Sequence, residues 1–134
     1  MGPVNWLAVI LAANLAVAVG IVWYGPLFRT GRPMLEGPGP AGKRPARNYG
    51  WAVVAMLVAA TMMGHNFARI GDATLSVKPW LYWMMSGGLA LFIICPALFL
   101  GLARHGVPTR DRVIDCGFWI AAFLTMGTVF WALS

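Results

Sequence analysis

Few side chains in this sequence could take part in chemistry, because only four of the 134 residues are acids and two are histidines. Three acids, Glu36, Asp72 and Asp111, fall in polar stretches, and only Asp115 lies inside an apolar run. An enzyme usually needs several ionisable or nucleophilic groups that converge on one place. No Ser-His-Asp set, HExxH helix or phosphate-binding loop is present. The sequence therefore predicts a protein that is not an enzyme and has no catalytic residue.

His65 is the side chain whose position is most compatible with a cofactor. It lies between Gly64 and Asn66 near the end of an apolar run, where a small neighbour would leave room for the ring of a tetrapyrrole. The alternative is an interfacial histidine that hydrogen-bonds with Asn66, water or lipid headgroups. His105 falls in a loop expected on the opposite side of the membrane, so the two histidines cannot hold one haem. Pigment or haem binding through His65, at a subunit boundary, stays an alternative hypothesis.

Three further side chains carry reactive groups inside apolar runs. Cys95 and Cys116 show no CxxC or other metal-ligand spacing, so we expect buried thiols and no metal site. Asp115 lies about one turn inside the last apolar run, where Arg110 or Arg112 could pair with it. We expect this acid to fix the adjoining loop, the alternative being a proton carrier. No acid lies deep in an apolar run, which argues against ion-coupled transport.

The composition excludes an ordinary soluble domain. Hydrophobic residues make up 60% of the chain and charged residues 10%, against roughly 45–50% and about 25% in soluble domains. The net charge of +6 does not indicate nucleic-acid binding, because the basic residues lie in loops between apolar runs and not along one helix face. These residues are better explained as topology determinants and contacts with lipid headgroups.

Four apolar runs must position the side chains described above, at about residues 6–28, 49–67, 80–102 and 113–133. Residues 6–23 contain no ionisable side chain and would form a helix of about 27 Å, close to the hydrocarbon thickness of ~30 Å. Pro26 ends the first span, Pro96 predicts a kink in the third, and prolines between residues 29 and 48 predict a loop without helix. We expect an all-α polytopic membrane protein, with one four-helix domain over residues 1–134 and the first helix retained.

The distribution of Lys and Arg predicts the orientation. The first and third loops share one side of a four-span protein and carry eight basic residues, whereas the second loop carries two. These residues are Arg29, Arg32, Lys43, Arg44 and Arg47 in the first loop, Arg104, Arg110 and Arg112 in the third, and Arg69 and Lys78 in the second. At about 1 kcal/mol per basic residue near an anionic leaflet, the difference is large enough to decide orientation. Both termini are therefore expected on the non-cytoplasmic side.

Small residues at helical spacing predict where the spans touch, because helices in lipid associate through close packing and a few polar contacts. We expect such seams within the four-helix unit, with contact to another subunit as the alternative. They comprise Ala12, Ala16 and Gly20 in the first span, Gly87 and Gly88 in the third, and Gly117 and Ala121 in the fourth. Asn14 lies in the middle of the first span and is expected to hydrogen-bond across a helix interface. Aromatic residues expected as interfacial anchors are Trp6, Trp23, Tyr24, Trp51, Trp80, Trp83 and Trp131.

Several short motifs resemble one uncharacterised family of small four-span bacterial membrane proteins. They are Asn5-Trp6-Leu7-Ala8, Trp23-Tyr24-Gly25-Pro26-Leu27-Phe28, Gly71-Asp72-Ala73-Thr74-Leu75, Ile114-Asp115-Cys116-Gly117-Phe118 and Met126-Gly127. The resemblance covers nearly the whole chain, although the Pro- and Gly-rich first loop departs from it. It implies the four-span fold and a bacterial inner membrane, and it carries no catalytic residue over to this chain.

The sequence leaves two function classes beside pigment binding. The first is a non-catalytic accessory or packing subunit of a larger inner-membrane complex, of which an energy-transducing complex is one kind. Its partners would be membrane lipids and other integral membrane subunits. The second is a channel or exporter for small solutes, formed by several copies of the chain, with Asn14, Ser86 and Thr125 lining the path.

Overall fold

The computed structural model describes residues 3–28 and 45–134, and this part of the chain is helical with no strand. Two of the elements are π-helical turns, written η, that continue or connect α-helices. The elements are α1 (Trp6–Val22), η1 (Trp23–Leu27), α2 (Pro45–Ile70), α3 (Asp72–Val77), α4 (Leu81–Leu89), η2 (Ala90–Ile94), α5 (Cys95–Arg104) and α6 (Thr109–Ala132). The predicted all-α class is confirmed.

Four helical stretches are long and apolar enough to cross a membrane: Trp6–Leu27, Tyr49–Ile70, Leu81–Arg104 and Thr109–Ala132. The shortest has 22 residues, which is about 33 Å of helix and matches a hydrocarbon core of ~30 Å. Their mean hydropathy lies between 1.4 and 2.2. The chain is therefore a multi-pass membrane protein with four spans.

Two helix starts differ from the sequence prediction. The loop expected through residue 48 is helical from Pro45 onward, because proline is compatible with the first turn of a helix, where no amide donor is needed. The last helix begins at Thr109, so Asp111 lies in its first turn and not in a loop. A short helix, α3, occupies part of the expected connection between the second and third spans. The remainder of the first loop, residues 29–44, lies outside the described residues.

Both prolines inside spans are associated with π-helical turns. Pro26 lies within η1 at the end of the first span, and η2 ends directly before Cys95 and Pro96 in the third. Proline lacks an amide hydrogen, so the carbonyl one turn earlier loses its usual partner, and a wider turn accommodates the change. The expected kink at Pro96 thus takes the form of a π-helical turn between α4 and α5.

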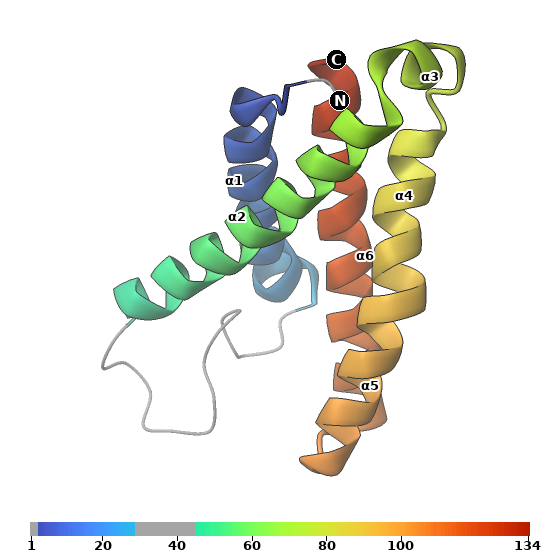
Figure 1. The fold of residues 1–134 in the computed structure, drawn as a ribbon. Helices are drawn as coiled ribbons and strands as arrows, with labels where there is room; N and C mark the ends of the chain where they lie inside the picture. Colours follow the sequence, from blue (N-terminus) through green and yellow to red (C-terminus); the bar gives the residue numbers. More distant parts are fainter. Residues whose placement is uncertain (1–2, 29–44) are drawn as a thin grey trace.

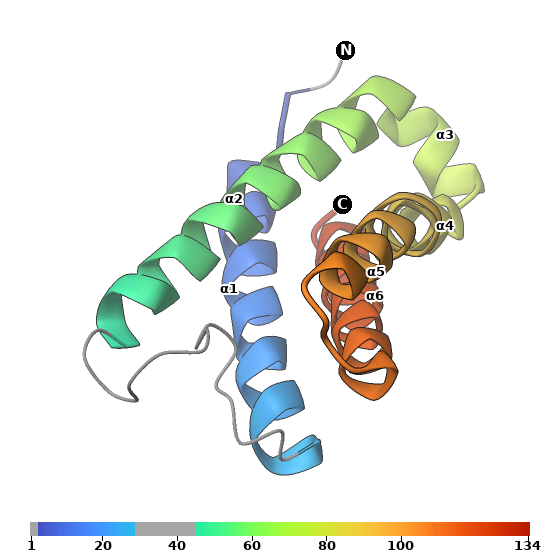
Figure 2. The ribbon, with the colours of Figure 1, turned by 90° about the horizontal axis from the view of Figure 1, so that it is seen from below.

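The helices α1 and α6 form the centre of the bundle. α1 packs against α2 and α6, and α6 packs in turn against α4 and α5. Figure 2 shows α2 crossing α1 obliquely, with its C-terminal end reaching toward α3 and α4, and it shows α4 and α5 beside α6. In the most apolar 18-residue stretch of each span, 39% of residues are buried in the first and fourth spans but only 17% in the third. The third span therefore presents most of its surface outward.

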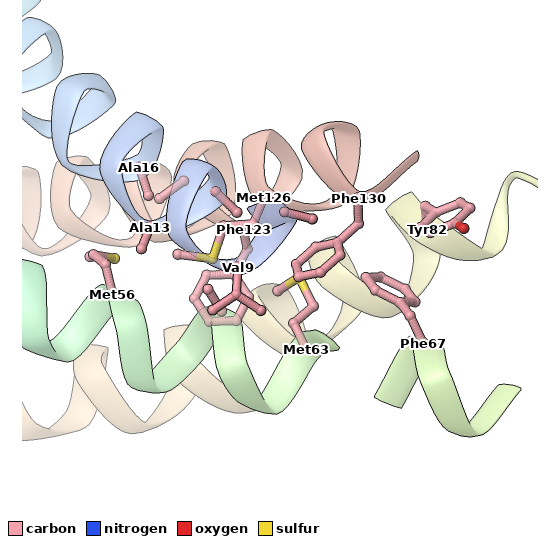
Figure 3. Packing of buried hydrophobic residues seen from close by; sticks show 14 of the residues in the cluster. Val9, Ala13, Ala16, Met56, Met63, Phe67, Tyr82, Phe123, Met126 and Phe130 are labelled. Carbon is pink, nitrogen blue, oxygen red and sulfur yellow. The ribbon is translucent and has the colours of Figure 1, made fainter. Parts of the chain in front are cut away.

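The core is built from alanines on α1 and from larger side chains on α2 and α6. Figure 3 shows Ala13 and Ala16 of α1 beside Met56 of α2, with Phe123 and Met126 contributed by α6. Both alanines are fully buried. Small side chains on one helix allow its neighbours to approach closely, which maximises dispersion contacts where lipid provides no hydrophobic driving force.

Both ends of the described chain lie at the same end of the bundle (Figure 1). The Asn5 side-chain amide donates a hydrogen bond of 3.0 Å to the carbonyl oxygen of Leu133. The side-chain oxygen Oδ1 of Asn5 accepts a hydrogen bond of 3.1 Å from the backbone N–H of Ala8 and caps α1. One side chain therefore starts the first helix and ties it to the end of the last.

Candidate functional site

A cavity of about 350 Å³ opens at the end of the bundle that carries both termini. We call it the end cavity; its walls come from the segment before α1 and from α2, α3, α4 and α6. Its lining includes Asn5, Gly64, Phe67, Asp72, Tyr82 and Phe130. This volume falls in the range of about 300–1,000 Å³ typical of small-molecule sites.

Three aromatic rings form the apolar wall of the end cavity. The ring of Phe67 lies 4.7 Å from that of Tyr82 and 5.2 Å from that of Phe130, measured between centroids. Figure 3 shows the three side chains grouped at one end of the core. Each residue is at most 5% exposed, so the three rings are closely packed, and all three line the cavity.

Two polar groups of the end cavity have no partner among the described residues. The Tyr82 hydroxyl makes no hydrogen bond there, although the residue is only 3% exposed. The Asp72 carboxylate forms no ion pair within the same residues, although Arg69 and Lys78 lie nearby in the sequence. These two groups are therefore available to a ligand.

The opposite end of the bundle is held together by side chains of the first and fourth spans. The Tyr24 hydroxyl donates to the carboxylate of Asp115 at 2.7 Å, and the Trp23 indole donates to the carbonyl oxygen of Ile114 at 3.0 Å. The sequence suggested Arg110 or Arg112 as the partner of Asp115. Arg112 instead donates to the hydroxyl of Thr109 at 2.8 Å and covers the ring of Phe99, 4.5 Å from its centre.

The two cysteines, 21 residues apart, lie opposite each other between α5 and α6. The Cys95 thiol donates to the carbonyl oxygen of Cys116 at 3.5 Å, and the Cys116 thiol donates to that of Cys95 at 3.6 Å. Both are free thiols. No group of three or more His, Cys, Asp or Glu side chains suitable for a metal ion occurs within residues 3–28 and 45–134.

His65 lies on the exposed side of α2. Its Nδ1 is 3.0 Å from the carbonyl oxygen of Thr61, and its ring meets that of Trp6 edge-on at 6.4 Å. The neighbouring Gly64 faces inward, where an added Cβ would lie 3.1 Å from Val9 and 3.3 Å from Phe130. The glycine therefore serves the packing of α2 against α1 and α6, on the side away from the exposed imidazole.

Asn14 faces away from the rest of the bundle. Its side-chain amide donates to the carbonyl oxygen of Ile10, one turn earlier, at 2.8 Å. The side-chain oxygen Oδ1 of Asn14 accepts no hydrogen bond from the residues that the structure describes. The sequence predicted a bond across a helix interface, and no such bond forms within residues 3–28 and 45–134. A polar amide is thus exposed near the middle of a membrane span.

The small residues that the sequence marked as seams occupy different surroundings. Ala12, Ala16 and Gly20 are buried on α1, and Ala121 is half-buried. An added Cβ at Gly117 would lie 2.8 Å from the ring of Trp23, and one at Gly87 would lie 2.8 Å from Leu124, whereas Gly88 meets nothing within 4 Å. A tight contact between α4 and α6 lies at Gly127, where an added Cβ would lie 2.8 Å from the backbone carbonyl oxygen of Tyr82. Gly127 was not among the predicted seam residues.

The aromatic residues expected as anchors divide into two groups. Trp6, Trp51, Trp80 and Trp131 are exposed near the ends of spans, where indole rings suit the headgroup region. Trp83 donates to the hydroxyl of Thr128 at 2.9 Å, and its ring lies 5.3 Å from that of Trp131 with the two planes tilted by 47°. Trp23 and Tyr24 are half-buried and join the first span to the fourth, as described above.

Sequence reasoning missed Tyr82 as a cavity residue and missed the pairing of the two cysteines. Tyr82 stands in the motif Trp80-Leu81-Tyr82-Trp83, which suggested an interfacial belt. No local pattern in the sequence separates Tyr82 from these neighbours, because it faces α2 and α6 only once the helices are assembled. Likewise, Cys95 and Cys116 are brought together by the antiparallel turn between α5 and α6.

Comparisons with known proteins give one family match. The family described as "Protein of unknown function (DUF1761)" matches residues 7–131. No curated protein matches the chain, and no solved structure does. The matched range covers the four spans except for Trp6 and Ala132 at their outer ends, and it includes the aromatic wall of the end cavity. The chain therefore belongs to the DUF1761 family.

Proposed function

We propose that the chain is a non-catalytic subunit of a larger membrane complex, and that its first span docks against a helix of another subunit. The observation that carries this proposal is the outward-facing amide of Asn14. Asn14 is the ninth residue of a 22-residue span, so in a membrane its side chain would lie well inside the hydrocarbon. There an unpaired carbonyl oxygen is costly, whereas a donor on a neighbouring helix would satisfy it.

The surface around Asn14 suits a second helix. Ala18, one turn further along α1, is also exposed, so a neighbouring backbone could come close beside the amide. Ile10 and Ile21, 52% and 51% exposed, extend the same face with apolar contacts. A polar group flanked by a small residue and by branched apolar residues is the pattern expected of a helix interface in lipid.

Co-purification in a mild detergent tests this proposal. The wild type should bring down at least one other membrane protein in a fixed ratio. Asn14→Leu should lower the affinity about 3- to 30-fold, since an interhelical hydrogen bond contributes ~0.6 to 2 kcal/mol. Val58→Leu, at a 67% exposed position of α2, is the matched control and should leave the partner bound. A wild type that purifies as a monomer, or only with copies of itself, would contradict the proposal.

The two alternatives lead to different results. In a homo-oligomeric channel, Asn14 would line a path between copies, but Ser86 is fully buried between α4 and α6 and donates to the carbonyl oxygen of Tyr82 at 2.8 Å. Solute flux into proteoliposomes of the pure chain, lost in Asn14→Leu, would favour that reading. Pigment or haem binding through His65 would give the purified protein a visible absorption band that disappears in His65→Leu.

We further propose that the complex resides in a bacterial inner membrane and that both termini face the periplasm. The basic residues of the expected first and third loops support this orientation. Alkaline phosphatase, which folds only in the periplasm, should be active when fused after Ser134, and green fluorescent protein at the same position should stay dark. The reverse pattern would show that the C-terminus faces the cytoplasm and would contradict the proposed orientation.

A further inference from the structure

We propose that the end cavity binds an ammonium group, carried either by a phospholipid headgroup or by a small free amine. This inference is independent of the docking role of Asn14, because the end cavity involves the interior sides of the helices and the short helix α3.

The charge of the cavity wall favours a cation over an anion. Among the described residues, Asp72 is the only charged side chain in the lining, and no Lys, Arg or His takes part in it. The carboxylate is exposed and has no ion pair within the same residues. A ligand with a positive charge would therefore find an unneutralised partner at the mouth of the cavity, whereas a phosphate or carboxylate would be repelled.

The aromatic wall supplies the second half of the site. Phe67, Tyr82 and Phe130 present aromatic surface to the same cavity that Asp72 borders. Aromatic faces attract ammonium groups through the ring quadrupole, and clusters of such rings are the recurrent solution for quaternary ammonium ligands. The unpartnered hydroxyl of Tyr82 adds a hydrogen-bond acceptor for a primary ammonium.

The position of the end cavity makes lipid a realistic source of the group. Exposed tryptophans mark this end of the first, third and fourth spans at Trp6, Trp80 and Trp131, and such residues lie at headgroup level in membranes. A volume of about 350 Å³ accommodates a headgroup or a small amine but not the acyl chains of a phospholipid. The same dimensions suit ethanolamine, choline and their lipid esters.

The lipid source is tested by native mass spectrometry of the full chain released from nanodiscs that contain equal amounts of phosphatidylethanolamine and phosphatidylglycerol. General attraction to the net charge of +6 favours the anionic phosphatidylglycerol. The collision energy is raised until phosphatidylglycerol dissociates from the chain. If one phosphatidylethanolamine per chain stays bound at that energy, the result would support the proposal and identify the lipid.

The free amine is tested by calorimetric titration of choline into the chain in nanodiscs of phosphatidylglycerol alone. Saturable binding would support the proposal and identify a free amine as a ligand. If choline failed to bind and the two lipids were lost together, the proposal would be overturned.

Substitutions assign either signal to the end cavity. Asp72→Asn should weaken ammonium binding about two- to fivefold, the range for an exposed ion pair. Tyr82→Phe should weaken the binding of phosphatidylethanolamine, whose ammonium can donate to the hydroxyl, about two- to threefold. Asp111→Asn, which removes a carboxylate at the opposite end of the bundle, is the matched control and should leave binding unchanged. Asp72 is exposed, so its variant should keep the circular dichroism of the wild type. A folded Asp72→Asn protein that binds as tightly as the wild type would refute the assignment.

Discussion

Gly127→Ala is expected to destabilise the bundle by about 1–3 kcal/mol, the range for a group forced into a packed interior. An added Cβ at this position would collide with the hydroxyl of Ser86 and lie 2.8 Å from the backbone carbonyl oxygen of Tyr82. A backbone atom cannot rotate away as a flexible side chain can, so α4 and α6 would have to separate. Ser86 is itself fixed, because it is fully buried and hydrogen-bonded to the same carbonyl.

The control for this substitution lies on the facing helix. Gly88→Ala makes the same chemical change in α4 but meets nothing within 4 Å, and alanine is favoured over glycine in a helix by about 1 kcal/mol. Gly88→Ala should therefore be neutral or stabilising. The free energy of unfolding of both variants can be measured in mixed micelles titrated with SDS. Equal stability of the two variants would mean that α4 and α6 are not this close.

Tyr24→Phe is expected to cost about 1.5–3 kcal/mol, the range for a hydrogen bond to a charged group. The hydroxyl donates to Asp115 at 2.7 Å and both residues are half-buried, so its removal leaves a carboxylate oxygen without this donor. The bond also joins the end of the first span to the start of the fourth, which are 91 residues apart. Its loss should therefore loosen the contact between α1 and α6 at this end.

A double-mutant cycle isolates the interaction. Asp115→Asn alone and Tyr24→Phe alone should each destabilise, and the double variant should lose clearly less than the two losses added together. Tyr49→Phe, which removes a tyrosine hydroxyl at a more exposed position, should change stability by less than about 0.5 kcal/mol. Additive losses in the cycle would show that the two side chains do not interact.

Hydropathy was sufficient to predict the four spans and the all-α class. Residues 6–23 contain no ionisable side chain and are long enough to cross a bilayer, and three further apolar runs of similar length follow. Helix ends were harder, because a proline can either begin or break a helix. Pro45 begins α2, whereas Pro26 lies in a π-helical turn at the end of the first span.

The outward position of Asn14 had a signal in the sequence that local reasoning did not use. At 100° per residue, Asn14 lies about 200° from both Ala12 and Ala16, which places it opposite the small-residue stripe. Because that stripe packs inside the bundle, the amide must face outward. In contrast, the pairing of Tyr24 with Asp115 depends on the assembled helices, and no local pattern in the sequence specifies it.

The central claim is that a protein helix covers the Asn14 face of the first span in the membrane. Photo-crosslinking in intact cells tests it most directly, with a benzophenone amino acid at Ile10, one turn from Asn14, or at Phe92 on the outward side of the third span. We predict that position 10 forms a crosslinked species with one other protein and that position 92 yields mainly lipid adducts. Lipid adducts alone at position 10 would contradict the claim.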